Sequence, residues 1–120
     1  MKNVPFEIAK KLKEKGFNLP SGEVIGKYDS DGVYHSQLYI NFTETMDSEE
    51  IIAPTISQVL KWLREKNSLF IQIMFVDKSS YYYEVIDIAT EQVKCSSGDY
   101  KESPEQAALA GIEYVLDNLI

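Results

Sequence analysis

Two consecutive strand-like segments, residues 69–76 and 81–88, constrain the fold most. The first has apolar residues at both alternating sets of positions, which is typical of a strand covered on both faces. The second is rich in Tyr, Val and Ile, which favour strands. The polar residues 77–80 between them predict a turn, and therefore an antiparallel hairpin. We expect the first segment to be a central strand of a sheet.

Three helices are predicted from apolar spacing and from residues that favour helix ends. The first spans residues 4–15, with Asn3 as its N-cap and Gly16 as its C-terminal stop. The second and third follow Ser/Thr-x-x-Gln patterns that begin at Thr55 and Ser103. Each of these patterns predicts a capping box, in which side chains bond to the free backbone N–H groups of the first helical turn.

A second hairpin is predicted within residues 23–42, because strand-forming residues flank the turn sequence Asp29-Ser30-Asp31-Gly32. A weak strand or ordered loop is expected within residues 91–100. The element order is then α-β-β-α-β-β-α. This order predicts one α+β domain spanning residues 1–120, with a four-stranded, mainly antiparallel sheet packed by helices. The layers form either an α/β/α or a two-layer sandwich.

Strand parity predicts an aromatic sheet face. If Ile86 points toward the helices, the opposite face carries Tyr39, Tyr81 and Tyr83. So large an aromatic surface is rarely left exposed on a monomer. Either a helix or a second chain covers it, and we favour a helix because three are available. Together with Trp62, at the edge of the apolar stripe of the second helix, these tyrosines are the candidate partner-binding residues.

Charge and hydropathy bear on the class of partner. The net charge is −7, and residues 1–16 hold five Lys against two Glu, a local balance of +3. An acidic surface repels phosphate backbones, so we do not expect nucleic-acid binding; the Lys-rich helix is the only basic stripe. The apolar run 69–76 is too short to span a bilayer. We expect a cytoplasmic protein with no membrane contact.

Catalytic groups are scarce. The chain has one His and one Cys, which excludes His/Cys metal clusters, Cys-His pairs and disulfides within one chain. His35 lies on a strand with no nucleophile nearby, and Cys95 lies near a turn. The acidic residues within 44–50 indicate a solvated loop. A catalytic carboxylate pair needs one buried carboxylate, and none of these residues lies among apolar residues. We therefore predict no enzymatic activity, no cofactor and no metal site.

Three motifs together resemble a known group of sequences. They are the segment 6–17 (FEIAKKLKEKGF), the Ala53-Pro54-Thr55 sequence followed by residues 62–65 (WLRE), and the C-terminal segment 114–120 (YVLDNLI). This pattern resembles a family of small uncharacterised proteins from gut Bacteroidales, often associated with phages or mobile elements. That resemblance implies no activity and no functional residues. The C-terminal helix after a Tyr-rich strand is also similar to HicB-type antitoxins, although their Pro-Asp-Leu-Pro-Gly signature is absent.

These observations favour a small, non-catalytic cytoplasmic interaction protein of phage or mobile-element type. Its partner is an unidentified protein or a second copy of the chain. The alternative is an antitoxin-like or nucleic-acid-associated regulator that uses the basic stripe of the first helix.

Overall fold

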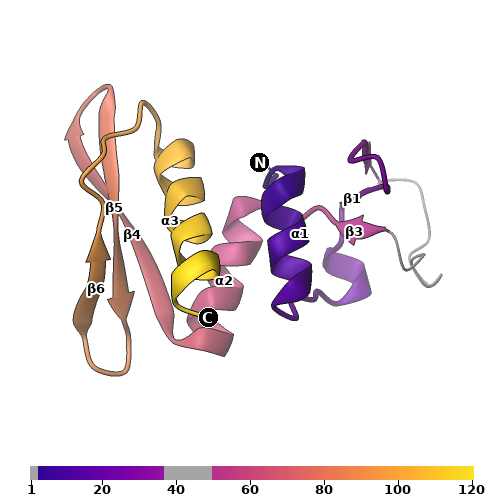
Figure 1. Cartoon of the computed structure of the whole chain (residues 1–120), viewed down its shortest axis with the longest axis horizontal. Helices are drawn as coiled ribbons and strands as arrows, with labels where there is room; N and C mark the ends of the chain where they lie inside the picture. The colour runs from indigo at the N-terminus through magenta and orange to yellow at the C-terminus, as the bar shows by residue number, and fades with distance from the viewer. Residues whose placement is uncertain (1–2, 37–49) are drawn as a thin grey trace. The chain divides into compact units, whose positions relative to one another are not determined.

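The computed structural model describes residues 3–36 and 50–120, which fall into two units, Asn3–Thr55 and Ile56–Ile120 (Figure 1). Each unit contains one three-stranded antiparallel sheet, with strand orders β2-β1-β3 and β4-β5-β6. The chain is therefore α+β, as predicted. The predicted four-stranded sheet is wrong, and within the described residues six strands replace the four in the predicted element order. The assignment of residues 1–120 to one domain stays a prediction.

The first unit combines one helix with a small sheet. Its elements are α1 (Phe6–Glu14), the 3₁₀ turn η1 (Ser21–Glu23), β1 (Gly26–Tyr28), β2 (Tyr34–Ser36) and β3 (Ile51–Ile52). Helix α1 buries Ile8, Ala9 and Leu12 and ends before Gly16, whose positive φ of 83° suits glycine at a helix stop. The predicted N-cap Asn3 is wrong, because Pro5 occupies that position without a side-chain cap bond.

The central strand of this sheet, β1, is held to the N-terminal part of the chain by a hydrogen bond and an aromatic contact of Tyr28. The buried hydroxyl of Tyr28 donates a 2.6 Å hydrogen bond to the carbonyl oxygen of Val4. The ring of Phe6 meets Tyr28 edge to face at 5.4 Å between centroids. The predicted Asp-Gly turn is confirmed, since Gly32 takes a φ of 82° and its N–H donates to the carbonyl oxygen of Asp29.

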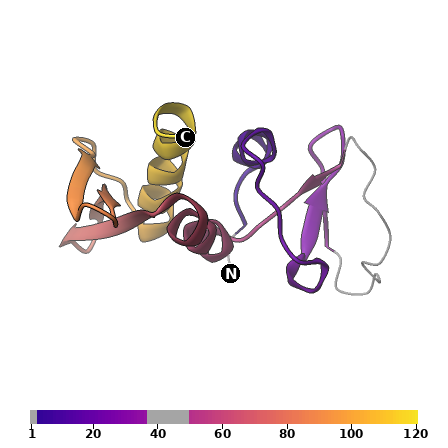
Figure 2. The same ribbon diagram turned by 90° about the horizontal axis from the view of Figure 1, so that it is seen from below.

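The second unit is a helix, a three-stranded meander and a second helix. Its elements are α2 (Ile56–Asn67), β4 (Leu69–Asp77), β5 (Ser80–Asp87), β6 (Gln92–Ser96) and α3 (Pro104–Asn118). Both helices lie on one face of the β4-β5-β6 sheet, so this unit is a two-layer sandwich (Figures 1 and 2). Its core, between the helices and the sheet, includes Leu63, Ile71, Val85, Ile112 and Leu116.

The start of α3 confirms the predicted N-cap and shows a modified form of the predicted capping box. Ser103 is its N-cap, and the Ser103 hydroxyl oxygen accepts a 3.2 Å hydrogen bond from the N–H of Gln106. The Gln106 side chain reaches back to the N–H of Glu102, one residue before the cap, at 3.1 Å. Pro104 occupies the first helical turn, where no backbone donor is needed.

Two predictions about the strands are corrected. Strand β4 lies at the border of its sheet and not at its centre, because β5 pairs with both β4 and β6. The strand parity is also reversed: Tyr83 and Val85 are buried beneath α3, while Ile86 points to the other face. Helices α2 and α3 both lie on the Tyr83 face, so the expectation that a further helix would cover the face opposite the helices is not met.

Candidate functional site

The face of the β4-β5-β6 sheet opposite α2 and α3 is the candidate site, and we call it the open face. Cross-strand partners share a face, so the register places Phe70 beside Ile86, Met74 beside Tyr82 and Val93 beside Ile86. The ring of Tyr100 lies 5.8 Å from that of Tyr82. The open face comprises Phe70, Gln72, Met74, Tyr82, Glu84, Ile86, Val93 and Tyr100.

Near the middle of the sheet, exposure distinguishes this face from the helix-covered one, whereas Phe75 at the end of β4 is exposed although it belongs to the covered face. Phe70 is 38% exposed, Val93 54% and Tyr100 61%, whereas Ile71, Tyr83 and Val85 on the covered face are each below 8%. Two polar residues, Gln72 and Glu84, face each other across β4 and β5 in the middle of the open face. The open face is therefore apolar and aromatic with a polar centre, a composition suited to protein contact.

The candidate residues named from the sequence lie elsewhere. Tyr39 lies outside the described residues. Tyr83 is buried against α3, and Tyr81, half-buried at the start of β5, stacks edge to face on Phe75 at 5.8 Å. Trp62 is half-buried on α2. The structure brings Tyr81 and Tyr83 onto one face, but that face is the one the helices cover.

Sequence reasoning did not name Tyr82, Val93 and Tyr100, which the sheet does present. A signal for them was available in the chain. Gln72 and Glu84 belong to the alternating sets of β4 and β5 that also contain Phe70 and Tyr82. A polar residue on each of two paired strands marks the set that faces solvent.

A cluster around Cys95 lies on the covered side of the sheet. Burial, together with the neighbouring Cys95 thiol, raises the pKa of Tyr83 to about 12. A hydrogen bond with Cys95 also raises the pKa of Tyr114, whose ring centroid is 6.4 Å from that of Tyr83. Tyr83 and Tyr114 thus both interact with the Cys95 thiol, which links α3 to β5 and β6.

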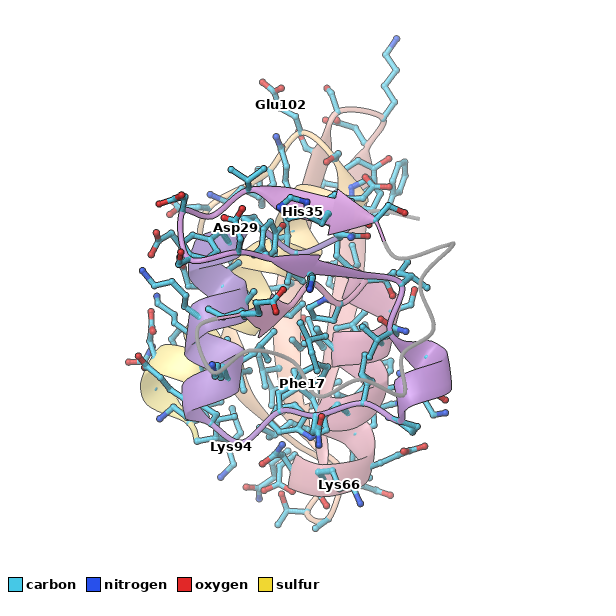
Figure 3. All side chains as sticks on the ribbon, turned by 90° about the vertical axis from the view of Figure 1, so that its right-hand side faces the viewer. Phe17, Asp29, His35, Lys66, Lys94 and Glu102 are labelled. Atoms are coloured by element: carbon cyan, nitrogen blue, oxygen red, sulfur yellow. The ribbon has the colours of Figure 1, made fainter. Side chains whose placement is uncertain are left out.

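The side chains of His35 and Asp29 form a polar pair on the β1–β2 hairpin of the first unit. His35 Nε2 lies 2.9 Å from Asp29 Oδ2, and both side chains are seen on the hairpin in Figure 3. Asp29 Oδ1 accepts hydrogen bonds from the N–H groups of Asp31 and Val33. These bonds, that of His35 above all, lower the pKa of Asp29. Every bond of Asp29 holds the turn, so the pair has a structural role.

A cleft of about 400 Å³ opens beside α1. Its lining includes Lys10, Lys13, Glu14 and Ser30. Lys10 forms an ion pair with Glu7 at 3.3 Å and lies 5.1 Å from the ring centroid of Phe6. Lys13 donates to the carbonyl oxygen of Glu50. Both cations of this cleft are thus engaged within the chain.

Within residues 3–36 and 50–120, no group of three or more His, Cys, Asp or Glu side chains is arranged to hold a metal ion. In the same ranges, no helix has the length and apolar content needed to cross a membrane. Comparison of the chain with protein-family models, with curated proteins and with solved structures gives no match. The geometry of the open face is accordingly the basis for a functional proposal.

Proposed function

We propose that this chain is a small, non-catalytic cytoplasmic interaction protein that binds a protein partner through the open face of its β4-β5-β6 sheet. The observation that carries the proposal is the exposure of Phe70, Val93 and Tyr100 on a sheet face that neither helix of the unit covers. Apolar and aromatic side chains gathered on one face mark sites where another surface docks.

The chemistry of the open face supports a protein partner in particular. Tyr82 and Tyr100 supply large, rigid contact area at low entropic cost, and their hydroxyls add hydrogen bonds. Gln72 and Glu84 add polar groups at the centre, which favour a partner with matching donors. None of the eight residues that define the face is Lys or Arg, whereas nucleic-acid surfaces are rich in these cations.

The test is site-specific photo-crosslinking in the cells that produce the protein. The crosslinking amino acid p-benzoylphenylalanine replaces Tyr100, which is 61% exposed on the open face, or Tyr34, which is 42% exposed in the other unit. We expect a discrete protein adduct from position 100 and none from position 34.

A second substitution tests that the adduct depends on the face. Val93→Lys places a charge at a 54% exposed position on β6 and should abolish the adduct from position 100 without unfolding the protein. Two outcomes would overturn the proposal. One is that positions 100 and 34 crosslink to the same proteins, and the other is that the adduct from position 100 still forms in the Val93→Lys variant.

A further inference from the structure

The outer border of β4 carries unpaired backbone groups. The N–H of Ile88 donates to the carbonyl oxygen of Ser68 at 2.9 Å, so even-numbered residues of β4 bond to β5. By alternation, the N–H and C=O groups of Ile71, Ile73 and Phe75 point away from β5. The hydrogen bonds on the other side of β5 support this alternation. There the odd-numbered residue Tyr81, which lies opposite Phe75 of β4, exchanges both backbone hydrogen bonds with Lys101 and not with β4. Among residues 3–36 and 50–120, no strand pairs with this border of β4.

Strand β4 lacks the features that normally protect a border strand. Residues 69–76 include no charged residue, no Gly and no Pro, and the strand is nine residues long. Border strands usually carry Lys or Pro, are short, or are interrupted by bulges. The register irregularity of β4 lies only at its end, between Phe75 and Asp77.

Strand β6, at the opposite border of the same sheet, is protected in these ways. It has five residues, includes Lys94, and is irregular in register where Val85 and Ile86 of β5 face it. The two borders of one sheet thus differ in length, charge and regularity. Of the two borders, β4 is the one that lacks protection against pairing with another strand.

We propose that the border of β4 pairs with the same border of a second copy of this chain, antiparallel and centred on Ile73. In this register Ile73 faces its own copy and Ile71 faces Phe75, so the outward backbone groups of all three meet partners. Phe75 and Val76, which are 68% and 44% exposed, gain apolar neighbours. Asp77 falls opposite Leu69, so no like charges face each other.

This inference rests on the proposed function and deepens it. Joining the two borders makes one six-stranded sheet from the two three-stranded ones, with the open faces of both copies side by side. A partner then meets a surface twice as wide. Because a single pair of strands buries little area, we expect a weak and reversible association, with a dissociation constant on the order of micromolar.

The first test measures mass in solution by sedimentation velocity from about 1 to about 500 µM of the full chain, a range that brackets a micromolar constant. We expect the mass to rise from 13.7 kDa toward twice that value with concentration. Phe75→Lys, which adds a charge at the β4 border, should abolish the rise. Val93→Lys, the same change in charge on β6, should leave it intact. A wild-type chain that is monomeric throughout, or a rise unaffected by Phe75→Lys, overturns the proposal.

The second test is amide hydrogen exchange over the same concentrations. The amides of Ile71, Ile73 and Phe75 should become protected as concentration rises. The amide of Ser96, which points away from β5 at the other border, should not. Equal exchange at Ile73 at all concentrations refutes strand pairing even if a dimer forms by another surface.

The experiments distinguish failure of the β4 pairing from failure of the open-face partner. Loss of the concentration-dependent mass with an intact adduct at position 100 refutes the β4 pairing alone. A dimer that gives no adduct at position 100 refutes the open-face partner alone.

Discussion

Gly111 of α3 lies so close to Ile71 of β4 that a Cβ atom on Gly111 would be 2.8 Å from Cγ2 of Ile71. The ring of Tyr83 is 3.2 Å from the same point. The absence of a side chain at position 111 therefore sets how closely α3 approaches the sheet. This close approach buries Tyr83 and Val85 and determines which face of the sheet is open.

Gly111→Ala should destabilise the protein by about 1–2 kcal/mol, because the overpacking at Ile71 outweighs the better helix propensity of Ala. Urea denaturation measures the change. Gly98→Ala is the control, since no atom lies within 4 Å of its added Cβ, and its effect should stay within about 0.5 kcal/mol. Wild-type stability in Gly111→Ala would show that α3 does not pack this closely.

Ser103→Ala should lower the free energy of unfolding by about 1 kcal/mol, because the N–H of Gln106 loses its acceptor at the start of α3. Ser103→Asp keeps an acceptor oxygen at the N-cap and should retain most of the stability. Thermal unfolding followed by circular dichroism distinguishes the two variants. Equal losses in both would argue against capping by the side chain.

Tyr83 should make the protein less stable at alkaline pH. Its pKa in the folded chain is about 12 against an ordinary value of 10.0, so between these values the unfolded chain releases a proton that the folded chain keeps. Its stabilising contribution is complete below pH 10 and is lost as pH rises toward 12, by up to about 1 kcal/mol per pH unit. Denaturation of Tyr83→Phe across this range should show a shallower decline than wild type. Parallel curves would contradict this assignment.

His35→Ala should raise the pKa of Asp29 toward its ordinary value, because the His35 hydrogen bond is the largest cause of its lowering. The remaining N–H donors, Asp31 and Val33, should keep the pKa somewhat low. Asp77 is the control: its pKa is lowered chiefly by the N–H of Ser79 and should not move. Carbon-13 NMR titration of the carboxyl groups measures both values.

The same reasoning gives the direction of the pH effect on the hairpin. A lowered carboxyl pKa means that the stabilising bonds of Asp29 are present above its unfolded pKa and are lost as pH falls through its folded pKa. In the titration, an Asp29 pKa that is the same in His35→Ala and in wild type would show that the pair contributes nothing to this carboxyl.

The helices were predictable because their ends carry local chemical signals. Ser103, Pro104 and Gln106 act within one turn of chain, so no distant contact is needed to place the start of α3. The turn at Gly32 was predictable for the same reason. In contrast, the N-cap of α1 has no side-chain bond at all, and the sequence rule chose the wrong residue.

The sheets were only partly predictable, because strand pairing depends on distant residues. Strand β3 has two residues, Ile51 and Ile52, which is too short for any periodicity, yet its pairing with β1 completes one sheet. Parity within β5 is ambiguous, since both alternating sets contain Tyr. The polar residue Glu84 marks the exposed set, and the register that places Glu84 opposite Gln72 agrees with this assignment.

The meander of the second unit also governs how quickly this part of the chain can fold. Strands β4 and β5 are separated by two residues, and β5 and β6 by four, so every strand pair joins neighbours in sequence. Closing such short loops loses little chain entropy, and proteins dominated by local contacts fold fast. The β4–β5 hairpin, which has the shorter of the two loops, is therefore the strand pair that we expect to form first.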